Sequence, residues 1–197
     1  MRLLFPEPVN EIDLATVYGD MPHHDLRPAV RLNMIVSVDG GTSWNGVSGA
    51  LGGAADKALF SVLRSLTDVV LVASATMRAE HYGPAMLAPT IQDARRRRGQ
   101  SPVPRIAVVS RTCQFDWSTP FFTAAMERPI VFTVSSAAEE DRVRAADVAE
   151  VIIAGEEDVD LTQAVAELGS RGATNVLAEG GPTLNGQLAR AGLLDEL

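Results

Sequence analysis

A carboxylate and a pair of glycines follow a short apolar run late in the chain. Glu179 and the Gly-Gly pair come directly after Asn175–Ala178, and Pro182 stands where a helix could begin. Glycines let a ligand approach the backbone, and the free N–H groups at a helix start attract phosphate. The segment is therefore a candidate anion site with a carboxylate beside it. An ordinary tight turn between a strand and a helix is the alternative interpretation.

Polar side chains also occur at the ends of three other apolar runs. Ligands of open parallel sheets bind at the carboxyl ends of the strands, so we expect these side chains to form one cleft. Each residue taken alone is more typical of a cap or a turn. The residues are Asn33, Ser37 and Asp39 on or after the run Val30–Val38, Ser74, Thr76 and Arg78 after Val69–Ala73, and Ser110 and Arg111 after Ile106–Val109.

The elements that must position these residues alternate between short apolar strands and amphipathic helices. This alternation predicts an α/β protein with a three-layer α/β/α core and a mostly parallel central sheet. Helices are expected at 54–66, 161–172 and 182–191. Strands are expected at Val30–Val38, Val69–Ala73, Ile106–Val109, Ile130–Val134, Val151–Ala154 and Asn175–Ala178.

Composition and missing motifs exclude several classes of protein. The net charge of −8 argues against a nucleic-acid or anionic-membrane binder. No apolar run approaches the ~20 residues that span a bilayer, and the first residues do not resemble a signal peptide, so we expect a cytoplasmic protein. Cys113 is the only cysteine, and the three histidines lack metal-ligand spacing, so no metal site is expected. G-x-G-x-x-G, Walker and G-x-S-x-G motifs are also missing.

Three further segments have weaker signals. Residues 1–29 are irregular and rich in proline, and we expect an arm that wraps the core. The stretch Glu80–Gln100 is long for a loop, which favours a lid or partial disorder. The run Arg95–Arg98 within it is expected to be a solvated loop or helix end rather than a polyanion patch. Lys57 is the only lysine among 17 basic residues, which is consistent with a composition bias.

Four segments carry a family resemblance. They are Leu32–Gly40, Leu63–Arg64, Asp68–Ala79 and Glu179–Leu184. In this order they resemble the pyrimidine reductase of riboflavin biosynthesis, which has a dihydrofolate-reductase-like fold. The likeness covers about residues 30–197, which we expect to form the reductase domain. Because the family continues into further strands, we expect the natural chain to extend beyond Leu197.

The resemblance implies an enzyme that uses NADPH and acts as a homodimer. The expected reaction reduces 5-amino-6-(5-phosphoribosylamino)uracil to its ribitylamino form, with hydride transfer to the sugar C1. The resemblance and the strand ends together predict site residues with three roles. Glu179 and Asp39 would be catalytic; Asn33, Ser48 and Arg64 would contact substrate; and Ile35, Thr76, Glu80, Ser110, Arg111, Gly180, Gly181, Pro182, Thr183, Leu184, Asn185, Gly186 and Gln187 would hold the cofactor. Within the cofactor set, Arg111 is expected to read the 2′-phosphate, because a guanidinium forks onto phosphate oxygens.

Departures from the family pattern leave alternatives open. Asn33 stands where many members carry lysine, and residues 80–87 lack an arginine that helps to hold substrate in the family. Arg95–Arg98 could supply that arginine from the longer loop. The chain also lacks the motifs of a fused zinc deaminase, so we expect a stand-alone reductase domain. A reductase of another pterin- or flavin-like substrate, of the dihydrofolate type, and a non-catalytic NADPH-binding regulatory protein remain as alternatives.

Overall fold

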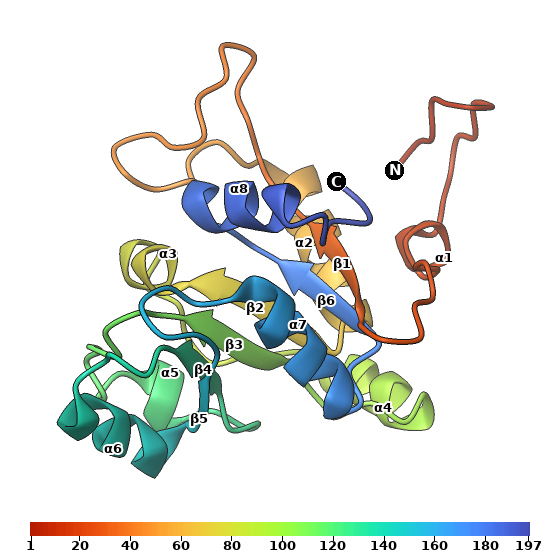
Figure 1. Cartoon of the computed structure of the whole chain (residues 1–197). Helices are drawn as coiled ribbons and strands as arrows, with labels where there is room; N and C mark the ends of the chain where they lie inside the picture. The colour runs from red at the N-terminus through yellow and green to blue at the C-terminus, as the bar shows by residue number, and fades with distance from the viewer.

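Six strands form one parallel sheet in the computed structural model, which describes all residues 1–197 (Figure 1). The strands lie in the order β1-β6-β2-β3-β4-β5, and every neighbouring pair is parallel. The predicted mostly parallel α/β fold is confirmed. The strands are β1 (Ala29–Leu32), β2 (Val69–Ala73), β3 (Arg105–Val109), β4 (Ile130–Thr133), β5 (Glu150–Ile153) and β6 (Asn175–Ala178).

Helices cover both faces of this sheet. Successive side chains along a strand point to opposite faces, and both sets are therefore buried. In β2, Val69 and Leu71 pack with α7 and α8, whereas Val70 and Val72 pack with α3, α5 and α6. The protein therefore has the expected three layers. The helices are α1 (Leu14–Val17), α2 (Ala54–Leu66), α3 (Ser74–Ala79), α4 (Pro89–Arg97), α5 (Pro120–Thr123), α6 (Glu139–Val148), α7 (Leu161–Ser170) and α8 (Pro182–Arg190). No helix combines the length and the apolar character that crossing a membrane requires.

The first strand is shorter than predicted. β1 ends at Leu32 instead of continuing to Val38, and Val38 is fully exposed. The Asn33 N–H still donates to the Ala178 carbonyl at 3.0 Å, after which the chain leaves the sheet. The apolar residues at 34–38 therefore belong to the long irregular connection between β1 and α2, which Figure 1 shows in orange.

The stretch expected as a long loop contains α4, and the expectation that Arg95–Arg98 is a solvated segment is wrong for Arg95. Arg95 is fully buried, and its guanidinium donates to the carbonyls of Ser65 and Thr67 at 2.9 and 2.7 Å. Burial lowers the pKa of Arg95 to about 10. Arg98 also donates to the Ser65 carbonyl, at 2.9 Å. These side chains satisfy carbonyl groups at the C-terminal end of α2 instead of reaching a ligand.

The C-terminal segment lies along the outer edge of β1. The Leu32 N–H donates to the Glu196 carbonyl at 2.8 Å, and the Asp195 N–H donates to the Val30 carbonyl at 2.9 Å. The Asp195 carboxylate in turn accepts hydrogen bonds from Arg27 at 2.7 and 2.9 Å. Segments from the two ends of the sequence are therefore joined beside the first strand.

Candidate active site

A cavity of about 410 Å³ opens at the carboxyl ends of β1, β6 and β2. One face of α2 forms one wall, and α3 with the segment that follows it forms another. The connection between β1 and α2 contributes Thr42, Ser48 and Gly49. The cavity therefore lies where ligands of parallel α/β sheets bind.

Glu179 is the buried carboxylate of this cavity, with a side chain only 2% exposed. The Arg64 guanidinium donates to both of its oxygens, from Nε and Nη2, at 2.7 Å each. The Tyr82 hydroxyl donates to Oε2, also at 2.7 Å. The protein itself supplies the cation, in the bidentate geometry that gives strong charge-assisted hydrogen bonds.

Two aromatic rings also contact the guanidinium of Arg64. Its guanidinium carbon lies 4.4 Å from the centre of the Phe60 ring and 5.4 Å from that of Tyr82. Burial opposes its charge, but the hydrogen bonds from Arg64 to Glu179 outweigh burial and raise the pKa of Arg64. Its Nη1 makes no hydrogen bond within the chain, and the side chain lines the cavity. Nη1 is therefore available to an acceptor on a ligand.

Tyr82 is a functional candidate that sequence reasoning missed. Burial, followed by the negative charge of Glu179, raises the pKa of Tyr82 well above its ordinary value. The hydroxyl therefore stays protonated and remains a donor to the carboxylate. No pattern marked Tyr82, because it lies in the segment 80–87 where the sequence departs from the family. Its partner Glu179 is distant in sequence, so their contact has no local signal.

The Gly-Gly turn between β6 and α8 fits closely against α3. Gly180 has a φ of +92°, and a Cβ built on Gly181 would lie only 2.5 Å from the Thr76 Oγ1. Gly181 is also the N-cap of α8, where no side chain caps the helix, and Pro182 follows. The N–H groups of the first turn are therefore not capped by a side chain. This geometry agrees with the anion site inferred from the sequence.

The predicted cofactor residues of α8 divide into two kinds. Leu184 is buried in the core beneath the helix, so only its backbone is available to a ligand. Asn185 is also buried, and its Oδ1 has no hydrogen-bond partner. Its amide lies close to Gly180, with Nδ2 3.5 Å from the position of a Cβ on that glycine. An unsatisfied buried amide beside the turn is suited to a polar ligand group.

Most other predicted residues near β1 and α3 meet at the cavity. Asn33, Ile35, Thr76 and Glu80 line it together with Ser48. The Ser48 N–H donates to the Glu80 Oε1 at 2.5 Å, which joins the connection before α2 to the end of α3. The structure therefore brings the predicted substrate residues and part of the predicted cofactor set to one place.

Asp39, Ser110 and Arg111 do not line the cavity. Asp39 is exposed and accepts a hydrogen bond from the Ser37 hydroxyl at 2.5 Å, which lowers its pKa. Arg111 forms an exposed ion pair with Asp158 at 3.2 Å, and Ser110 is buried. The roles expected for these residues therefore remain predictions. Cavity residues that the sequence did not mark as site residues include Lys57, Phe60 and Tyr82.

Comparison with known proteins shows the family to which the chain belongs. The sequence matches the family model of the RibD C-terminal domain over residues 28–197. It is 28% identical over 174 residues to a 2,5-diamino-6-ribosylamino-4(3H)-pyrimidinone 5′-phosphate reductase from Archaeoglobus fulgidus, over 87% of this chain and 78% of the relative. A reductase of the same name from Methanothermobacter thermautotrophicus is 31% identical over 175 residues, which cover 87% and 76% of the two chains.

A solved structure shows the same fold. It is a pyrimidine reductase-like protein from Corynebacterium diphtheriae, 29% identical in sequence. The two structures agree with a TM-score of 0.81 over 92% of this chain and 77% of the other. The dihydrofolate-reductase-like fold expected from the sequence is confirmed.

Proposed function

Because the chain belongs to the RibD C-terminal domain family, the pyrimidine reductases of riboflavin biosynthesis, we propose that it reduces a phosphoribosylamino-pyrimidine with NADPH. When bound, NADPH supplies a hydride, which would go to the sugar C1 of the open, imine-like ribosylamine, while a proton from water would go to the imine nitrogen and NADP⁺ would be released. The product is the corresponding ribitylamino-pyrimidine.

The observation that carries this proposal is one cavity lined by Arg64, Glu179 and Thr76, with the Gly-Gly turn packed against Thr76 beside it. Arg64, Glu179 and Tyr82 form the polar substrate-type wall at the end of β6. Thr76 lines the same cavity and contacts the Gly-Gly turn, which leads into the uncapped start of α8. A dinucleotide held by the turn would thus lie beside a substrate held by Arg64.

The residues of this chain would act mainly by positioning and by hydrogen bonding. The backbone N–H groups of Gly181, Thr183 and Leu184, at the start of α8, would hold the diphosphate, and the unsatisfied amide of Asn185 would meet a polar group of the cofactor. The Nη1 of Arg64 would donate to a pyrimidine acceptor, while Glu179 and Tyr82 keep the guanidinium in place. Preorganised donors of this kind stabilise charge without reorganisation during reaction.

Two pyrimidines of the same class are candidate substrates. The curated relatives are named for a 2,5-diaminopyrimidinone, whereas the resemblance noted in the sequence points to the uracil. The two compounds differ at C2, which carries an amino group in one and a carbonyl oxygen in the other. The named relatives favour the diaminopyrimidinone, and the uracil is the second candidate.

A substrate panel tests the proposal directly. Loss of NADPH absorbance should accompany reduction of one of the two phosphoribosylamino-pyrimidines, with dihydrofolate as the comparison substrate. Turnover of dihydrofolate alone would favour a reductase of pterin-like substrates. Binding of NADPH without turnover of any compound would identify a regulatory binder and contradict the proposal.

Cofactor choice gives a second test. We propose that Arg111 leaves its exposed pair with Asp158 to bind the 2′-phosphate of NADPH. Arg111→Ala should weaken NADPH binding about tenfold and leave NADH binding nearly unchanged, since one charge-assisted contact is lost. Asp158→Ala is the matched control and should not weaken NADPH. Equal losses for both cofactors would assign the 2′-phosphate to another residue.

We also propose that the enzyme is a homodimer, in line with the family likeness. Light scattering at micromolar concentration should give twice the mass of one chain. A monomer under these conditions would contradict this part of the proposal but not the reductase activity.

A further inference from the structure

Lys57, the only lysine of the chain, lies in the same cavity as Arg64 and Glu179. It belongs to the face of α2 that forms the wall, where Lys57, Phe60 and Arg64 follow at intervals of three and four residues. At 1.5 Å per residue, the seven residues from Lys57 to Arg64 separate their backbones by ~10 Å along the helix. Two basic side chains therefore stand at opposite ends of one wall.

The two basic side chains differ in their hydrogen-bond and ion-pair partners. Arg64 is bound by Glu179 on two of its nitrogens, whereas Lys57 takes part in no ion pair and its ammonium makes no hydrogen bond. The other two carboxylates of the cavity, Asp56 and Glu80, form no ion pair with it. Glu80 accepts the Ser48 N–H, and the Asp56 carboxylate folds back over Gly52.

The wall formed by the residues after α3 contains no lysine or arginine that could bind a phosphate instead of Lys57. Residues 80–87 contain neither lysine nor arginine, and His81 is charged only when protonated. Asp56, adjacent in sequence, also lines the cavity, and its carboxylate lies against Gly52. Of the lysine and arginine side chains that line the cavity, only Lys57 is not bound by a carboxylate.

We propose that Lys57 binds the 5′-phosphate of the substrate. The pyrimidine then lies toward Arg64, Glu179 and Tyr82, and the pentose extends along α2 to the other end of the wall. The separation along the helix is of the order of the length of a pentose phosphate. A lysine suits this task, since its ammonium is a compact charge on a flexible stem that can follow a phosphate. This inference rests on the proposed function and adds to it an orientation for the substrate.

The test compares one pyrimidine substrate with and without its phosphate, which a phosphatase removes. Lys57→Ala should raise KM for the phosphorylated compound about tenfold or more and change kcat by less than about threefold, because a charge-assisted contact to the substrate is lost. KM for the dephosphorylated compound should stay as in the wild type. Lys57→Arg should retain most of the affinity.

Arg97→Ala is the matched control. Arg97 is exposed on α4, makes no ion pair and does not line the cavity, so its loss removes one positive charge from a remote surface. KM for both compounds should be unchanged in this variant. An equal rise of KM in the two variants would assign the effect to overall charge and overturn the proposal.

Equilibrium binding of ribose 5-phosphate, with ribose as the comparison, separates this inference from the proposed reaction. The wild type should bind ribose 5-phosphate with an affinity that falls as salt rises, and Lys57→Ala should lose this preference over ribose. Phosphate binding through Lys57 without reduction of either pyrimidine would support the phosphate site and contradict the proposed function. Reduction with an unchanged KM in Lys57→Ala, or no binding of ribose 5-phosphate by the wild type, would overturn the inference.

Discussion

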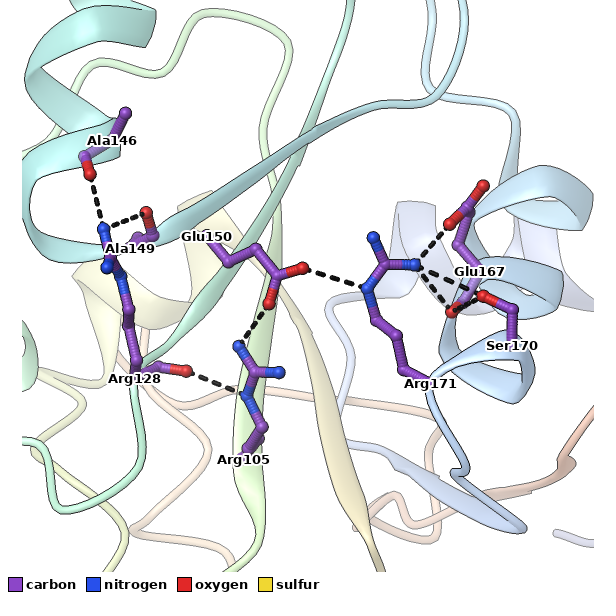
Figure 2. Close-up of polar contacts among 8 residues, drawn as sticks. All are labelled: Arg105, Arg128, Ala146, Ala149, Glu150, Glu167, Ser170 and Arg171. Carbon is purple, nitrogen blue, oxygen red and sulfur yellow. Dashed lines mark hydrogen bonds and ion pairs between the residues drawn. The ribbon is translucent and has the colours of Figure 1, made fainter.

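Glu179 and Glu150 each bind two partner side chains, but Glu179 lies at the carboxyl ends of the strands and Glu150 at the amino ends. The two carboxylates also differ in burial. Glu150 begins β5 at the amino edge, where Arg105 donates to it at 2.8 Å and Arg171 at 3.0 Å (Figure 2). Its side chain is 37% exposed, against 2% for Glu179. The hydrogen-bond lengths of the two clusters are similar, whereas their access to water is not.

The difference shows that burial, rather than bond length, decides what such a cluster is worth. Water can replace the partners of Glu150, so exposed ion pairs contribute at most ~1 kcal/mol each. Water cannot reach Glu179 freely, so the loss of its cation leaves a buried charge without compensation. The exposed cluster joins β3, β5 and α7, as Figure 2 shows, whereas the buried cluster holds a donor at the cavity.

The largest effect is expected when Arg64 is removed. Arg64→Met should lower the free energy of unfolding by about 3 kcal/mol, because Glu179 then keeps only Tyr82 as a partner. Arg105→Met, the matched change at the exposed cluster, should lower it by less than about 1 kcal/mol. Urea unfolding of both variants measures the difference. Equal losses would show that burial does not separate the two clusters.

A smaller effect on stability, but a large one on activity, is expected for Glu179→Gln. The amide keeps the shape of the side chain but loses the charge that orients Arg64, so turnover should fall by ~10²-fold while NADPH affinity stays near the wild type. Glu150→Gln should leave turnover unchanged. Turnover that is unaffected in Glu179→Gln would return Glu179 to a purely structural role.

The smallest effect is expected from acid acting on Glu150. The hydrogen bond from Arg105 lowers the pKa of Glu150 below its ordinary 4.5, burial opposes the shift, and Arg171 adds to it. The stabilisation from Glu150 is therefore complete above pH 4.5 and is lost as the pH falls below that value. The difference in unfolding free energy between wild type and Glu150→Gln should be below ~1 kcal/mol at neutral pH, and it should shrink in acid. A difference that grows in acid would contradict this assignment.

The strands and the main helices could be predicted because their signals are local. β2 and β6 have the expected bounds, and α2 begins and ends where its apolar spacing indicated. The sequence analysis does not predict α4 and α6, because Pro89–Arg97 and Glu139–Val148 are both rich in polar residues, and in α6 the few apolar residues do not share one face. β1 is shorter than predicted, because the apolar residues at 34–38 do not show where the chain leaves the sheet.

The candidate site could be predicted only in part. The Gly-Gly turn has a local signal, and family likeness indicated Arg64 and Glu179 as separate residues. Their mutual pairing was not predicted, because the two positions are 115 residues apart and no spacing rule connects them. Contacts between residues distant in sequence also position Tyr82 and Arg95. The sequence predicts a solvated position for Arg95, whereas its guanidinium donates to backbone carbonyls of residues 65 and 67.

The position of β6 between β1 and β2 has a consequence for synthesis on the ribosome. β6 follows the five other strands of the sheet in the sequence but pairs with both β1 and β2, so these two strands have no partner on their facing edges while the middle of the chain emerges. The half of the sheet made of β2, β3, β4 and β5 can pair first, because its neighbours follow one another in the chain. The half that carries the candidate site can close only after β6 has emerged, and until then the nascent protein exposes strand edges that chaperones can bind.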